Sequence, residues 1–193
     1  MTPHSSDPMP AEKKDDKSQA QIDYESGQKF LTNNDLSQAT VAFHNALKQF
    51  EEEKNENGIA NANDKLGDIC VSRKEYDRAQ KFYAKTYEIC KKHEDEFSLF
   101  SIEKKLAALM FATDAFEEAI KSYLKILDHY TLMRNPQGSV ETLITLAQIY
   151  EKKGAGDKAA EAYTMAASIH KNFKHEKEHD TLMELAAKAI GTS

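Results

Sequence analysis

Tryptophan is absent from this chain of 193 residues, and cysteine, proline and glycine are scarce, with 2, 4 and 7 copies. All prolines except Pro136 lie within the first ten residues. Because proline and glycine break helices most strongly, their scarcity predicts an all-α protein. The two cysteines, Cys70 and Cys90, are too few for a disulfide framework and predict buried thiols in a reducing compartment.

Long apolar runs and an excess of positive charge are also missing. No stretch approaches the roughly 20 apolar residues that span a bilayer, and the first residues lack the apolar segment of a signal peptide. The net charge is −6, and no dense stripe of Lys or Arg marks a nucleic-acid-binding face. These absences predict a cytoplasmic protein that neither inserts into membranes nor binds nucleic acid.

Residues 1–20 combine prolines, serines and charges of both signs with almost nothing to bury. This composition predicts a disordered N-terminal leader, and a recruiting motif within it is the less favoured alternative. Residues 21–190 are predicted to form a single repeat domain.

From residue 21 onward, the sequence repeats itself every 40 residues without insertion or deletion. Short polar breaks such as "TNNDL" and "SRKEY" divide each unit into two amphipathic helices. The pattern predicts four helix-turn-helix repeats, at about 21–55, 60–95, 100–135 and 140–174. The aligned positions are small residues at Gly27, Gly67, Ala107, Ala147 and Ala187, alanines at 39, 79, 119 and 159, and aromatic residues at Phe43, Tyr83, Tyr123 and Tyr163.

A fifth first helix, at about 176–190, has no second helix after it. A single amphipathic hairpin cannot bury its apolar face, so neighbouring hairpins must stack into a solenoid. The last helix is then predicted to cap the exposed end, with a polar face that includes His175, Glu176, Glu178 and His179.

These ladders resemble the tetratricopeptide repeat (TPR) family, over residues 21–190. The first repeat carries the family pattern at Gly27, Phe30, Ala39, Phe43 and Ala46, and the fourth at Leu146, Ala147, Tyr150, Ala159, Tyr163 and Ala166. Two features depart from the usual pattern: the period is longer than the usual ~34 residues, and the helix-ending proline is missing. The chain therefore resembles the long-repeat subgroup that includes mitotic-spindle adaptors, kinesin light chains and bacterial peptide-responsive regulators.

The resemblance implies a right-handed α-α superhelix in which the first helices of the repeats line a concave binding groove. Transferred position by position, this feature predicts partner-binding residues in all four repeats. They are Gln21, Tyr24, Gln28 and Leu31, then Asn61, Asp64, Asp68 and Val71, then Ser101, Lys104, Ala108 and Phe111, and finally Glu141, Ile144, Gln148 and Glu151. One branch of the family clamps terminal carboxylates, but here the clamp positions hold Tyr24, Gln28, Lys65, Ser101 and Lys105, so no clamp is expected.

The sequence contains none of the common catalytic or phosphate-binding motifs. There is no phosphate-binding loop, no GxSxG and no HExxH, so we expect no enzyme activity and no cofactor. "GAGD" at 154–157 is most simply a turn. His170, His175 and His179 could approach a metal ion, but a solvated last helix explains them more simply and no metal site is predicted.

The leading hypothesis is a non-catalytic adaptor or scaffold that holds a peptide or helical segment of another protein in its concave groove. One alternative is a scaffold that self-assembles into a homo-oligomer, for example by stacking solenoid ends. Another is a regulator that responds to a peptide or a small molecule. The sequence does not choose the partner or the pathway.

Overall fold

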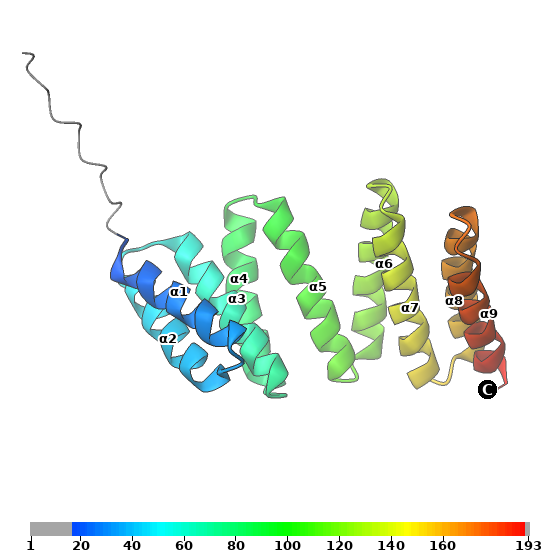
Figure 1. The fold of residues 1–193 in the computed structure, drawn as a ribbon, viewed down its shortest axis with the longest axis horizontal. Coiled ribbons are helices and arrows are strands. Elements are labelled where there is room, and N and C mark those ends of the chain that lie inside the picture. Colours follow the sequence, from blue (N-terminus) through cyan, green and yellow to red (C-terminus); the bar gives the residue numbers. More distant parts are fainter. Residues whose placement is uncertain (1–16, 192–193) are drawn as a thin grey trace, which may run out of the picture. The chain divides into compact units, whose positions relative to one another are not determined.

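The computed structural model describes residues 17–191, and nearly all of this range is helical (Figure 1). Nine helices and no strand occur among these residues. Their bounds are α1 (Gln19–Thr32), α2 (Leu36–Glu52), α3 (Glu56–Ser72), α4 (Tyr76–Lys92), α5 (Glu96–Ala112), α6 (Phe116–Leu132), α7 (Pro136–Lys152), α8 (Gly156–Asn172) and α9 (Glu176–Ile190). The predicted all-α repeat is confirmed, and no helix within 17–191 is long and apolar enough to cross a membrane.

The chain divides into two compact units, and the division lies between Ala62 and Asn63, inside α3. We call the part up to Ala62 unit 1 and the part from Asn63 onward unit 2, and each is described by itself. The predicted leader falls mostly outside the described residues. Helix α1 begins at Gln19, because the Ser18 side chain accepts a hydrogen bond from the backbone N–H of Gln21 and caps the helix there. The single domain over 21–190 stays a prediction.

All eight turns between helices have the same construction. Three residues separate consecutive helices, and the middle one has a positive φ. These residues are Asn34, Lys54, Lys74, Glu94, Asp114, Arg134, Gly154 and Lys174. The residue that follows donates its N–H to a carbonyl in the last turn of the preceding helix, as Asn135 does to Tyr130 at 2.8 Å. "GAGD" lies at one of these turns, as predicted: Gly154 and Ala155 belong to the turn, and Gly156 and Asp157 begin α8.

Several of the following helices are capped by a side chain from the last turn residue. Asp35, Asn55, Asp95 and Asn135 each accept a hydrogen bond from a backbone N–H three residues later, at 2.9–3.1 Å. This bond satisfies one of the donors that a helix N-terminus leaves without an intrahelical partner. Turn and cap together explain why the breaks recur at a fixed spacing.

At two positions of the small-residue ladder, an aromatic ring of the second helix fills the space beside the first helix. A Cβ atom built on Gly27 would lie 2.7 Å from Cε1 of Phe43, and one built on Gly67 would lie 2.6 Å from Cδ1 of Tyr83 and closer still to its Cε1. Such distances are shorter than any van der Waals contact, so the aromatic ring occupies the space that a side chain would need. The alanines 39, 79, 119 and 159 are fully buried beside these rings.

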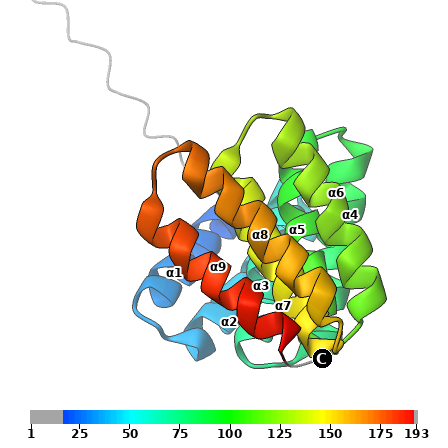
Figure 2. The same cartoon turned by 90° about the vertical axis from the view of Figure 1, so that its right-hand side faces the viewer.

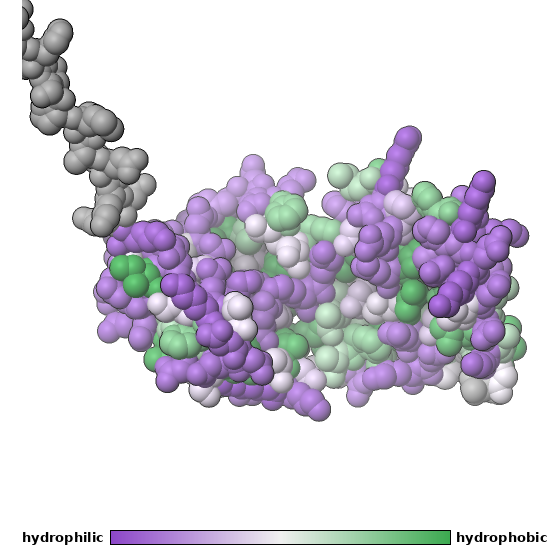
Figure 3. Space-filling model, in the orientation of Figure 1, coloured by the Kyte–Doolittle hydropathy of each residue, from purple (hydrophilic) through white to green (hydrophobic). Residues whose placement is uncertain are grey.

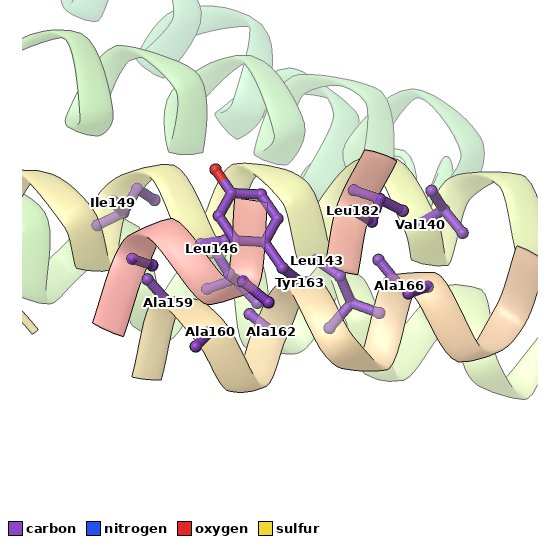
Figure 4. Packing of buried hydrophobic residues seen from close by; sticks show 14 of the residues in the cluster. Val140, Leu143, Leu146, Ile149, Ala159, Ala160, Ala162, Tyr163, Ala166 and Leu182 are labelled. Atoms are coloured by element: carbon purple, nitrogen blue, oxygen red, sulfur yellow. The ribbon is translucent and has the colours of Figure 1, made fainter. Parts of the chain in front are cut away.

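The largest core cluster belongs to unit 2 and joins α6, α7, α8 and α9. Figure 4 shows Leu143 and Leu146 of α7 with Tyr163 and Ala166 of α8, and Leu182 enters from α9. Helices α8 and α9 pack side by side (Figure 2). Smaller clusters form around Tyr83 in unit 2 and around Phe50 in unit 1.

One predicted member of the small-residue ladder, Ala187, does not pack against a second helix. Ala187 is exposed, whereas Ala186 beside it is only 5% exposed. In the earlier repeats this ladder position faces the second helix of the same hairpin, as Gly67 faces Tyr83. No second helix follows α9 within the described residues, so Ala187 has nothing to pack against.

Candidate interaction surface

A polar pocket lies on the first-helix side of unit 1, between α1 and the start of α3. Its volume is about 340 Å³, and it is lined by Gln21, Tyr24, Phe50, Asn55, Asn57, Gly58 and Asn61. The structure therefore brings together three of the residues that were predicted to contact a partner, namely Gln21, Tyr24 and Asn61. Two further amide residues, Asn55 and Asn57, were not among the predicted ones.

The apolar wall of this pocket is aromatic. Tyr24 packs edge-on against Phe43 with ring centroids 5.4 Å apart, and its ring lies 6.4 Å from that of Phe50. Phe50 can reach the pocket because Gly58 has no side chain: a Cβ there would lie 2.7 Å from Cδ2 of Phe50 and closer still to two other atoms of its ring. The sequence signal for this contact was a glycine at the start of a first helix, which recurs 80 residues later as Gly138 facing Tyr130.

The polar wall is made of side-chain amides. Asn57 and Asn61 are exposed, one turn apart on α3, and their amide groups make no hydrogen bond with another residue of the described chain. Gln21 donates to Glu25 at 3.0 Å, and Asn55 is engaged as the cap of α3 through its bond from Gly58. Asn57 and Asn61 are therefore the amides that a ligand can use.

In unit 2, two predicted residues form a charged cluster with a lysine that was not predicted. Lys105 Nζ lies 2.6 Å from Asp64 Oδ1 and 2.7 Å from Asp68 Oδ1, so it joins α3 to α5. Tyr83 donates its hydroxyl to Asp68 at 2.8 Å, and burial, with help from Asp68, raises the pKa of Tyr83. The signal that could have found Lys105 is Lys65, its counterpart one repeat earlier.

Lys104 does not join this cluster. Its ammonium donates to the Tyr130 hydroxyl at 3.2 Å and lies 5.2 Å from the centre of the Phe100 ring. The ring of His129 stacks on the ring of Phe100, with centroids 3.8 Å apart. The lysine is therefore held by α5 and α6, through a hydrogen bond and a cation–π contact.

The other predicted partner-binding residues lie outside both the pocket of unit 1 and the charged cluster of unit 2. Val71, Phe111 and Ile144 are half-buried and pack against the core clusters of unit 2 rather than standing free. Glu141 is exposed and accepts a hydrogen bond from Gln137 at 3.1 Å. The remaining ones are the exposed Gln28, Ala108, Gln148 and Glu151 and the half-buried Leu31 and Ser101.

A second hollow, which was not predicted, lies between the second helices α6 and α8 and has α7 as its floor. Two adjoining cavities of about 440 and 240 Å³ share Leu127, Leu143 and Met165. We call this hollow the second-helix groove. The other, first-helix face of unit 2 is the one that Figure 3 shows, and it carries hydrophobic residues among hydrophilic ones.

The histidines and cysteines between residues 17 and 191 form no cluster of three or more. His170 and His175 approach with their Nδ1 atoms 3.3 Å apart, and the His179 ring bonds Asp180 instead. Among the described residues no group of three or more ligand side chains could hold a metal ion. Cys70 and Cys90 are buried free thiols, as predicted, and burial raises the pKa of both.

A family model of soluble NSF attachment proteins (SNAPs) matches residues 10–141, more than half of the chain. The chain belongs to the SNAP family. No curated protein matches this SNAP-family chain.

Solved structures share its fold at low sequence identity. The apo form of RapI is 17% identical over 89% of this chain, with a TM-score of 0.73. A putative kinesin light chain from Podosopora anserina with TPR-like repeats is 13% identical over 89% of this chain and 84% of its own, with a TM-score of 0.72. MamA is 21% identical over 90% and 88%, with a TM-score of 0.57.

The SNAP-family chain spans 64% of the length of RapI. At these identities the likeness shows the fold alone, a TPR-like solenoid of α-helical hairpins. The predicted resemblance to the TPR family is thereby confirmed. A TPR-like SNAP-family chain is, in general terms, a protein-interaction repeat module.

Proposed function

We propose that this chain is a non-catalytic adaptor that binds an extended segment of another protein in the amide-lined pocket of unit 1. The observation that carries the proposal is the pair Asn57 and Asn61, whose exposed amides stand beside the aromatic wall of Tyr24 and Phe50.

The chemistry of the pocket suits a peptide backbone. Each side-chain amide offers donors and an acceptor, so it can bond the C=O and N–H groups of an extended chain whatever its side chains are. The half-buried Tyr24 ring adds apolar contact area for one side chain of the ligand, and Phe50, only 2% exposed, supports that ring from within the core. Because the helices already hold the wall in place, ordering costs fall mainly on the ligand.

The family supports a protein as the ligand, since it is named for attachment to NSF. The predicted residues on the first helices of unit 2, among them Asp64, Asp68 and Gln148, are proposed as a contact surface within that unit. The same proposal includes that the protein is not an enzyme, that it acts in the cytoplasm and that it does not bind nucleic acid.

The test uses peptides selected from a random library displayed on phage against the full chain. Binding of a selected, fluorescently labelled peptide is then measured by anisotropy to the parent chain and to a variant that combines Asn57→Ala and Asn61→Ala. We expect the affinity to fall about tenfold or more, because two backbone-directed hydrogen bonds are lost.

Asn45→Ala is the matched control, because Asn45 is an exposed asparagine on α2 away from the pocket lining. It should leave the affinity unchanged. If the double variant binds the selected peptides as tightly as the parent chain, the pocket is not the binding site and the proposal is wrong.

A further inference from the structure

Helix α9 exposes the stripe that first helices normally bury against their own second helix. In α7 this stripe is Val140, Leu143, Ala147 and Tyr150, and the first three are at most 7% exposed. The 40-residue register places Asp180, Met183, Ala187 and Ile190 at the same positions of α9. Corresponding residues of the two helices therefore have the same orientation but different surroundings.

The α9 stripe is open to solvent. Met183 is 40% exposed, Ile190 is 57% exposed, and Ala187 is also exposed. The adjoining side of α9, with Leu182, is buried against the rest of unit 2. Figure 2 shows α9 at the near end of the chain, with no helix of the described residues over it.

We propose that this stripe is a dimer interface, covered by α9 of a second copy of the chain in antiparallel orientation. The shape of the stripe favours its own copy. An antiparallel pair that crosses at the level of residue 185 places the long side chain of Met183 opposite Ala187 of the second copy, and Ala187 opposite Met183 of the second copy. A protruding residue thus meets a small one twice, as close helix packing requires, while Asp180 and Ile190 meet at the two ends of the contact, where the carboxylate is exposed.

The charges beside the stripe also fit a second copy. Glu184 and Lys188 are exposed, one turn apart, and lie on the same flank of α9. In an antiparallel pair this flank adjoins the same flank of the second copy, so Glu184 meets Lys188 of the second copy and Lys188 meets Glu184. A parallel pair would instead place Met183 against Met183 and would not bring these two charges together.

The proposal is independent of the peptide pocket, which lies in unit 1. A single helix pair buries little surface, so the dimer is expected to be in exchange with the monomer and to form as the concentration rises.

Sedimentation equilibrium on the full chain measures this association. Lys188→Glu and Glu184→Lys should each weaken it about tenfold or more, because each places like charges opposite one another. A mixture of the two variants should associate again, since one chain then carries two acidic residues and the other carries two lysines at the contact. Lys81→Glu, at an exposed position of α4, is the matched control and should leave association unchanged.

Circular dichroism checks that each variant keeps its helices. A chain that stays monomeric at its highest soluble concentration would overturn the proposal. A dimer that both single variants leave intact, or a mixture that does not regain association, would overturn it as well.

Discussion

Gly67 lies in the middle of α3, where a glycine costs about 1 kcal/mol relative to alanine because of its conformational freedom in the unfolded chain. The contact with Tyr83 explains why residue 67 is a glycine despite this cost. The tyrosine ring is 2% exposed and occupies the place where a side chain on residue 67 would stand. The ring is in turn held by its hydroxyl, which bonds Asp68 one residue further along the same helix.

Gly67→Leu is therefore expected to lower the free energy of unfolding by about 1–3 kcal/mol, because the side chain forces the Tyr83 ring out of its position. Chemical denaturation followed by circular dichroism measures the change. Ala84→Leu, on the exposed side of α4, adds the same side chain without a steric conflict and should have little effect. An unchanged midpoint for Gly67→Leu would contradict the packing described here.

Tyr163 provides a test at high pH. Its ring is 3% exposed and its hydroxyl bonds Glu151 at 3.1 Å, and burial together with this carboxylate raises the pKa of Tyr163 to about 12. In the unfolded chain a tyrosine ionises near pH ~10. The folded state therefore keeps the proton longer, its stability is full below pH ~10, and it falls as the pH rises toward 12.

Replacing Tyr163 with phenylalanine removes this contribution. The free energy of unfolding of Tyr163→Phe should decline less steeply between pH ~10 and 11.5 than that of the parent chain. Urea denaturation at a series of pH values gives both slopes. Equal slopes would mean that Tyr163 ionises in the folded state as easily as in the unfolded one.

At the scale of elements, the backbone conformation of the turns is repeated more strictly than their amino-acid sequence. Eight turns have the same backbone, with a positive φ at the middle residue, yet only Gly154 is a glycine. The left-handed conformation is strained for residues with a Cβ and free of strain for glycine. The other turns therefore keep it because the hydrogen bonds that end each helix require it.

Arg134→Gly is accordingly expected to raise the free energy of unfolding by about 0.5–1 kcal/mol, because φ is 52° at this residue. Thermal or urea unfolding measures the gain. The neighbouring Met133 has φ −76°, so Met133→Gly relieves no strain and should be neutral or destabilising. A loss of stability in Arg134→Gly would show that the arginine side chain matters more than the backbone.

Elements and turns could be predicted because a 40-residue period leaves few alternatives for where helices begin and end. Helix α9 was predicted as a cap, but its packing could not be read from the period alone. Ala187 has the same place in the 40-residue pattern as Gly67 and Ala147, yet it is exposed because no helix follows α9 within the described residues.

At the scale of the molecule, the fold follows from the repeat, whereas the site depends on side-chain geometry that the repeat does not specify. Gln21, Tyr24 and Asn61 were predicted and do share a pocket. Lys105 was missed because its neighbour Lys104 occupies the predicted position, and only the helix rotation decides which of the two meets Asp64.

The second-helix groove was missed for a similar reason. The sequence pattern predicts that apolar residues on second helices are buried. Leu124 and Met165 are instead 44% and 48% exposed, because they line the space between α6 and α8. The division between Ala62 and Asn63 has no marker in the sequence either, since it falls inside one uninterrupted helix.

The proposed function requires that the amides of Asn57 and Asn61 bind a peptide backbone. Nuclear magnetic resonance on the labelled full chain tests it most directly, by following side-chain amide signals as a selected peptide is added. We predict that the signals of Asn57 and Asn61 shift in proportion to occupancy, while that of Asn45 does not move. Shifts confined to other residues, for example those lining the second-helix groove, would contradict the account.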